Sequence, residues 1–399
     1  MTRSKPSSIW FKAALLSISM MLMIAPNIAA ALPLMAKTFS DQSASAVDTL
    51  STIPNLGIIL GIVLGNVLAT QLGAKRTVLT GLAVALLSGL VPIVSNSYYV
   101  VLAARLIFGI AVGTFNSLAI SLISDYYRGD ELAAMMGYQS AISSLGSSLL
   151  SFAVGYLLLF GWHATFLIYA IALPIMILFG LVMPNDQPAP ATKDTAQTPK
   201  AKQHINAAVI LISLLTFFIY VFFMVVTIKL AGLLTANHLG TASQASAILG
   251  GFTLVTMLMG LLFGRIYKLL QNKILPLGFI LMAVGFYLVS TVSSLAIVAV
   301  GTVIIGIGFA VSIPYIYTII NVAAPANSKN LASSVMLIMT NIGVFLSPTI
   351  VNALAGLTGK DEAVGSMVVA SIGFLILAVI VAAVVISQKR TKPTVQERN

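Results

Sequence analysis

Long apolar runs alternate with short polar turns along the whole chain. Twelve runs reach or approach the roughly 20 residues that a helix needs to cross the hydrocarbon core of a bilayer. Backbone groups in lipid must be satisfied within their own segment, so we predict that each run is a transmembrane helix. The predicted spans are residues 12–36, 50–72, 76–95, 98–124, 133–159, 162–183, 206–234, 243–265, 273–292, 295–321, 331–356 and 363–387.

The first run has one feature of a cleaved secretory signal, because "IAAALPLMA" offers small residues at which cleavage could occur. The run is longer than the apolar region of a signal peptide, and eleven further spans follow it. We therefore predict a retained first helix.

The composition supports lipid as the solvent. The chain is 59% hydrophobic and 8% charged, with a mean hydropathy of +1.03, whereas soluble domains are roughly a quarter charged. The net charge of +11 could suggest a nucleic-acid partner. The basic residues are too scattered for a binding stripe, and we predict an all-α membrane protein that binds no nucleic acid.

Lysine and arginine are distributed unequally between the two sides of the predicted membrane. If the N-terminus is inside, seventeen of the 21 lie in inner segments, two (Lys37 and Lys360) lie outside, and Arg105 and Lys229 lie within spans. Inner loops of membrane proteins carry such an excess. We predict that both termini are cytoplasmic.

The stretch "PNDQPAPATKDTAQTPKAKQH" has the composition of a flexible linker. It divides the chain into residues 1–183, a linker at 184–205, and residues 206–399. "LIFGIAVGTF" in the fourth span is echoed by "VIIGIGFAVS" in the tenth, 197 residues later. We predict two pseudo-symmetric six-helix bundles with a small-molecule site near the membrane midplane between them. One chain holds both halves, which predicts a functional monomer.

Three motifs resemble the major facilitator superfamily, and the resemblance covers nearly the whole chain. "NVLATQLGAKR" is similar to the family's loop between spans two and three, although Thr70 and Gln71 replace an acid and an arginine. "RLIFGIAVG" resembles the span-four pattern, and "GWHATFLIYA" resembles the entry to span six in drug-exporting members. In span five, Gly146 is followed by serine, which departs from the Gly-Pro of the antiporter pattern.

The resemblance implies a secondary transporter of a bacterial cytoplasmic membrane that works by alternating access. It implies efflux of a small amphipathic compound, with protons as the coupling ion. There is no cysteine, and the three histidines lack the spacing of metal ligands. We therefore expect no enzyme activity, no cofactor and no metal.

The basic turn after the second span has two interpretations. Gly73 permits a tight reversal, and Lys75 and Arg76 follow it. Asp125, at the same side of the membrane, is their expected partner, and in the family such a pairing acts as a latch on one side of the transport cycle. Alternatively these residues only set the topology, because exposed ion pairs contribute little.

Arg105 is the most unusual residue, because a cation within a span is costly. It shares a helix face with Gly109, Gly113 and Asn116, and the glycines allow close approach of a neighbouring helix or a ligand. Arg105 either binds backbone carbonyls of another helix or acts as a cavity cation. Lys229 either extends to the outer interface or serves a cavity.

Other polar residues within the spans either hold helices together or bind a ligand. Gln139, Ser143 and Gly146 form one stripe of span five. The remaining candidates are Asn27, Tyr220, Tyr315, Tyr317 and Asn341.

The positions of the ten acids bear on the substrate. We place all of them in loops, span ends or tails, so any proton carrier would be Asp48 or Asp125 at a span end. With Arg105 and Lys229 the cavity is then expected to be positive, which favours neutral or anionic solutes. Uptake or exchange of a small organic anion is accordingly the alternative to efflux of an amphipathic compound.

Overall fold

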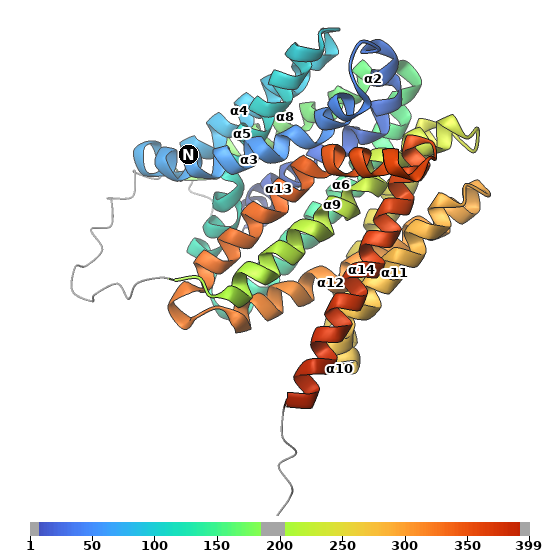
Figure 1. Cartoon of the computed structure of the whole chain (residues 1–399). Coiled ribbons are helices and arrows are strands. Elements are labelled where there is room, and N and C mark those ends of the chain that lie inside the picture. The colour runs from blue at the N-terminus through green and yellow to red at the C-terminus, as the bar shows by residue number, and fades with distance from the viewer. Residues whose placement is uncertain (1–7, 185–203, 392–399) are drawn as a thin grey trace, which may run out of the picture.

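The computed structural model describes residues 8–184 and 204–391, and within these ranges every regular element is helical (Figure 1). The N-terminal half holds α1 (Ile9–Leu22), α2 (Leu32–Thr38), α3 (Ala44–Leu72), α4 (Ala74–Leu90), α5 (Tyr98–Tyr126), α6 (Gly129–Leu157), α7 (Trp162–Thr165) and α8 (Ala172–Val182). The C-terminal half holds α9 (Ala207–Ala236), α10 (Ala242–Leu270), α11 (Ile274–Ser290), α12 (Leu295–Ala323), α13 (Lys329–Ala355) and α14 (Glu362–Thr391).

The helices account for the predicted spans. Ten helical stretches are long and apolar enough to cross a membrane, and the bent pair Ile9–Leu22 and Ala25–Thr38 raises the number to eleven. One of these stretches, Ala242–Ser290, is 49 residues long and contains α10 and α11 in succession. Counting those two helices separately gives the twelve predicted spans and confirms an all-α membrane protein.

Successive spans alternate in direction, which defines two ends of the molecule. We call the end where α8 finishes and α9 begins the linker side, and the opposite end the far side. Lys75 Nζ donates to the carbonyl of Met183 across the linker side, and Asn206 Nδ2 donates to the carbonyl of Ala323 there. Most of the predicted linker, residues 185–203, lies outside the described residues.

The first predicted span is two helical pieces rather than one. The break follows Leu22, the axis bends by 45°, and the chain continues as the 3-10 helix η1 (Ala25–Ala31) and α2. Pro26 and Pro33 explain the break, because proline cannot donate a backbone hydrogen bond and clashes with the preceding turn of a helix. A broken helix at membrane depth needs partners for its free backbone groups.

Glycines set the close packing of α3 on α5. A Cβ atom built on Gly109 would lie 2.1 Å from the carbonyl oxygen of Pro54, and one on Gly113 would lie 2.5 Å from that of Ile58. Gly61 is equally restricted, at 2.1 Å from the carbonyl oxygen of Ile110. These backbones therefore touch directly, and the two helices form one rigid body within the N-terminal half.

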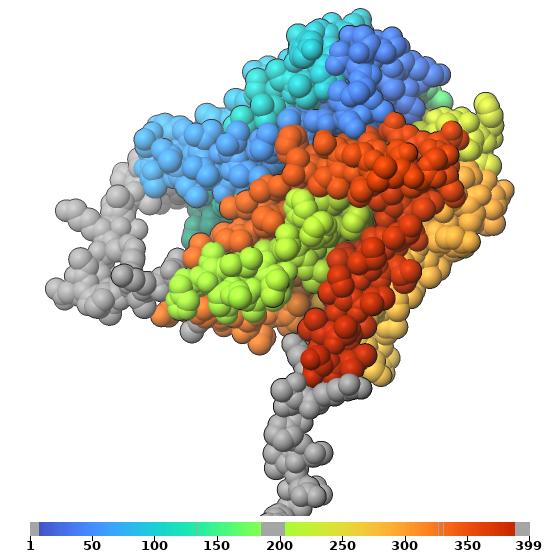
Figure 2. Space-filling model, in the orientation of Figure 1, coloured from blue at the N-terminus to red at the C-terminus, as the bar shows by residue number. Residues whose placement is uncertain are grey.

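The two halves touch through the far-side portions of their helices. α3 lies against α13 and α6 lies against α10. The buried residues of α10 are confined to Ala245–Phe252, at its far-side end, whereas Leu261 and Leu269 near its linker-side end are 71% and 82% exposed. In Figure 1, α3 and α13 lie close together at the right and diverge towards the left, and in Figure 2 the blue and orange surfaces of the two halves are in direct contact. The halves are therefore closed at the far side and separated towards the linker side.

Candidate functional site

The break in the first span is held by Arg105 of α5. Arg105 is 1% exposed, and it donates from Nη2 to the carbonyl of Ala25 (2.7 Å) and from Nε to that of Leu50 (2.9 Å). A third hydrogen bond joins it to the hydroxyl of Tyr169. Of the two interpretations of Arg105, the structure shows the one in which it binds backbone carbonyls. The expected cavity cation is wrong, because the guanidinium is fully enclosed.

Asn27 secures the other face of the break. Its Nδ2 donates to the carbonyl of Ser147 on α6, and its Oδ1 accepts from the hydroxyls of Ser147 and Ser151. The Ser143 hydroxyl donates to the carbonyl of Ser19, and a Cβ on Gly146 would lie 3.0 Å from Met20. The predicted polar stripe of span five therefore packs on the broken first span. Because η1 also packs against α9 and α10, this polar region faces the C-terminal half.

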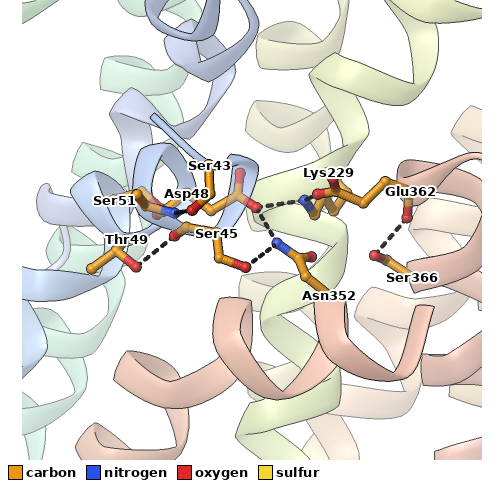
Figure 3. A network of polar contacts seen from close by, with 10 residues as sticks. Ser43, Ser45, Asp48, Thr49, Ser51, Lys229, Asn352, Glu362 and Ser366 are labelled. Carbon is orange, nitrogen blue, oxygen red and sulfur yellow. Dashed lines mark hydrogen bonds and ion pairs between the residues drawn. The ribbon is translucent and has the colours of Figure 1, made fainter. Parts of the chain in front are cut away.

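Lys229 belongs to a network that joins the two halves on the far side (Figure 3). Its Nζ lies 2.5 Å from Oδ2 of Asp48 on α3 and also contacts Oε1 of Glu362 at the start of α14. Asn352 of α13 donates from Nδ2 to Asp48 Oδ2 and to Ser45 Oγ, at 3.0 Å each. We call Asp48, Lys229, Asn352 and Glu362 the far-side ion network.

This network corrects two expectations about charge. α3 begins six residues before the predicted span, so Asp48 is a buried helical residue, 7% exposed, rather than a group in the loop. Lys229 does not extend to the outer interface, because it is 7% exposed and lies between two carboxylates. The expectation of a positive cavity is therefore wrong, since Arg105 is enclosed and Lys229 is neutralised.

Aromatic side chains gather halfway along the C-terminal helices. Phe223 of α9 stacks on Phe309 of α12 with ring centroids 3.6 Å apart, and Phe252 of α10 lies 5.9 Å from Phe223. Tyr220 packs edge-on against Phe309 at 5.6 Å. We call Tyr220, Phe223, Phe252 and Phe309 the aromatic cluster. Of these four residues only Tyr220 was predicted as a candidate, because the three phenylalanines are indistinguishable by sequence from core residues.

The other predicted site residues do not converge. Tyr315 donates to Asn272 Oδ1 near the linker side, and Asn341 Nδ2 donates to the carbonyl of Leu337 in its own helix. Gln139 and Asn116 are half-buried and make no hydrogen bond to another side chain within the described residues. Tyr317 is 42% exposed on α12.

The basic turn at Gly73 has a different partner from the expected one. Gly73 adopts φ 84°, in the region that favours glycine, and connects α3 to α4. Lys75 Nζ donates to the carbonyl of Met183 at 2.6 Å. Asp125 is exposed at the end of α5, and among the described residues no ion pair joins it to Lys75 or Arg76. The expected latch is thus not formed in this structure.

Two helical bundles that meet at the far side, with a broken span between them, are the architecture of a membrane transporter. The comparison with known families agrees. The chain belongs to the Major Facilitator Superfamily, whose family model matches residues 13–235 and 212–399.

Individual relatives are more distant. An uncharacterized transporter of Rickettsia bellii is 27% identical over 157 residues, and the match covers 38% of each chain, so this chain spans well under half of the curated relative. The nucleoside transporter NupG has a TM-score of 0.78 at 10% identity, covering 94% of this chain and 99% of that one. The xylose transporter XylE from E. coli, in an inward-open conformation, has a TM-score of 0.70 at 13% identity, covering 94% and 95%. These structures support the fold.

Proposed function

We propose that this protein is a secondary transporter that moves a neutral, amphipathic organic solute by alternating access, in the direction of efflux. The halves are in contact at the far side and diverge towards the linker side (Figure 1), which we take as cytoplasmic from the excess of lysine and arginine there. The solute binds between the polar groups around the broken first span and the aromatic cluster.

The observation that carries this proposal is the lack of an unpaired charge near the broken span and the aromatic cluster, since Arg105 beside the break is enclosed by its three acceptors. The central turns of α3, α5, α6, α9, α10, α12 and α13 contain no Asp, Glu, Lys or Arg. A charged solute entering a low-dielectric site needs a compensating charge, because burying an unpaired ion is expensive. Amide and hydroxyl groups on one side and aromatic faces on the other suit a solute that is polar at one edge and apolar elsewhere.

Transport of an organic anion has less support than the sequence suggested. That alternative depended on Arg105 and Lys229 as free cations in the cavity. Both are fully engaged, Arg105 with carbonyls and Lys229 with carboxylates. Efflux is proposed from the resemblance of "GWHATFLIYA" to drug-exporting members of the family.

The test compares three aromatic solutes that differ in charge. Inside-out vesicles containing the protein, or an empty-vector control, are energised with a proton gradient. Accumulation is followed for radiolabelled chloramphenicol, which is neutral, for ethidium, a cation, and for benzylpenicillin, an anion. We expect accumulation above the control for the neutral solute alone. Accumulation of ethidium alone, or of benzylpenicillin alone, would refute the proposed substrate class.

A further inference from the structure

The far-side ion network contains one more acidic group than basic groups. Lys229 alone faces two carboxylates, Asp48 and Glu362. Asp48 lies in the N-terminal half, whereas Lys229 and Glu362 both lie in the C-terminal half. The Asp48–Lys229 contact therefore crosses the boundary between the two moving bodies, and the Lys229–Glu362 contact does not.

Opening of the far side has different consequences for the two acids. α9 and α14 pack against each other within one half, so Lys229 and Glu362 remain paired when the halves separate. Asp48 loses both Lys229 and the amide of Asn352, because these two groups move away with the C-terminal half. Lys229 and the Asn352 amide both favour the ionised form of Asp48, so the carboxylate binds a proton more readily after these two groups have moved away.

In the part of the chain that the structure describes, no other charged group replaces Lys229 as the partner of Asp48. On α5, Tyr98 donates its hydroxyl to the carbonyl of Ala46, and Arg105 is held by its three acceptors. Lys37 on α2 is exposed to solvent. Lys360 and Asp361, beside Glu362, are also exposed and carry opposite charges. Asp48 thus depends on the C-terminal half for its ionised state.

We propose that Asp48 is a proton-binding site that is occupied when the far side is open and empty when Lys229 closes it. Glu362 has the supporting role of holding Lys229 in place, and its side chain is 41% exposed. A proton taken up from the far side then accompanies each opening of that side. The proposal rests on alternating access and is independent of which solute is carried.

Proton binding to Asp48 predicts a definite sign for the effect of pH. At high pH the ionised Asp48 binds Lys229, and the far-closed state is favoured. At low pH the protonated carboxyl gives up that contact, and the far-open state is favoured. For one linked proton, the ratio of far-open to far-closed molecules rises by at most about tenfold for each unit of decrease in pH.

The absence of native cysteine makes the test direct, because spin labels can be placed at chosen sites without background. Val94 and Leu357, which are 87% and 83% exposed, report the far side after substitution by cysteine. Thr70 and Leu269 report the linker side in the same way. Distances between the labels are measured by double electron–electron resonance in lipid nanodiscs, from about pH 8 to about pH 5, a range that covers a carboxyl in a perturbed environment.

The expected result is a pH-dependent shift to longer far-side and shorter linker-side distances as the pH falls. Asp48→Asn should be far-open at all these pH values, and Asp48→Glu should restore the response. Asp361→Asn is the matched control, because it removes an exposed acid beside the network and should keep the response. The proposal would be overturned if Asp48→Asn responded to pH as the unmodified chain does, or if Asp361→Asn alone lost the response.

A second measurement, at constant pH with added sodium, tests whether Asp48 binds a proton or a sodium ion. If sodium added at constant pH opens the far side, and Asp48→Asn abolishes that effect, the site binds sodium and the proton assignment is wrong. The measurement uses no solute, so its result is separate from the vesicle experiment. Failure of either experiment leaves the other interpretable.

Discussion

Substitution of Gly109 by alanine tests whether the backbones of α3 and α5 touch. The new Cβ would lie 2.1 Å from the carbonyl oxygen of Pro54 and 2.6 Å from its Cα, whereas ordinary contacts begin at 3.4 Å. Both neighbouring atoms belong to the backbone, so no side chain can rotate to make room. The helices would have to separate by more than an ångström, which is an overpacking error of about 1–3 kcal/mol or more.

Gly137 of α6 provides the matched control, because a Cβ built there would meet nothing within 4 Å. Gly137→Ala gains helix propensity of up to about 1 kcal/mol. Thermal unfolding can be followed by tryptophan fluorescence, since Trp162 of the N-terminal half is 4% exposed. At about 2–4 °C for each kcal/mol, Gly109→Ala should lower the Tm by several degrees, while Gly137→Ala leaves it unchanged or raises it. Equal Tm values for the two variants would refute direct backbone contact between α3 and α5.

Three further predictions concern the site and the turn. Arg105→Lys keeps the charge, but a lysine cannot reach all three acceptors of Arg105. We expect the free energy of unfolding to fall by about 1.5–3 kcal/mol for each hydrogen bond removed, which lowers the Tm and reduces transport. An unchanged Tm would contradict the role of Arg105 in holding the break. Lys75→Gln should lower the Tm slightly and Asp125→Asn should not, because among the described residues Lys75 has a cross-helix partner and Asp125 has none. Equal losses would indicate that the two side chains pair. Phe223→Ala should weaken the apparent solute affinity in vesicle uptake by roughly 2- to 12-fold, because an aromatic contact is lost. Tyr287→Ala, on the exposed face of α11, should leave that affinity unchanged. Equal effects of the two variants would show that the aromatic cluster is not part of the binding site.

The apolar pattern predicted the spans because length and hydrophobicity alone decide whether a helix can cross lipid. The same pattern missed the break at Leu22, since the residues on both sides of it are apolar. Pro26 was the available signal, but proline is tolerated within transmembrane helices, and its presence does not by itself indicate a break.

The sequence predicted the helix face on which Arg105 lies but not the groups that it binds. Its common face with Gly109 and Gly113 follows from helical spacing, and α3 indeed lies against that face. Its acceptors are the backbone carbonyls of Leu50 and Ala25, and any residue type can supply a carbonyl. No sequence pattern therefore distinguishes an arginine that binds carbonyls from one that faces a cavity.

The far-side ion network could have been predicted only by considering three distant span ends together. Asp48 precedes the second predicted span, Lys229 lies near the end of the seventh, and Glu362 precedes the twelfth. The alternation of spans places these three ends on one side of the membrane, so an acid–base–acid group there was a possible reading. The separations of 181 residues between Lys229 and Asp48 and 133 between Lys229 and Glu362 explain why local patterns did not show it.

Outside the far-side ion network, the hydrogen bonds between the two halves within the described residues come from hydroxyl groups that donate to carbonyls of the opposite half. Ser148 donates to Gly250 and Ser246 donates to Ser151, at 2.8 and 2.6 Å. Thr52 already divides its hydroxyl between Phe345 of the opposite half and Thr49 of its own helix, at 3.4 Å each. A serine or threonine in a helix can always turn its hydroxyl back to a carbonyl of the preceding turn.

These hydroxyl groups can therefore lose their partners in the opposite half without being left unpaired in a medium that has no water to satisfy them. Each hydroxyl exchanges one acceptor for another by rotation about a single bond, so these hydrogen bonds oppose separation only weakly. The far-side ion network is then the main polar contact that must break when the halves part. That arrangement suits a protein that must change shape in every cycle while both bundles stay folded.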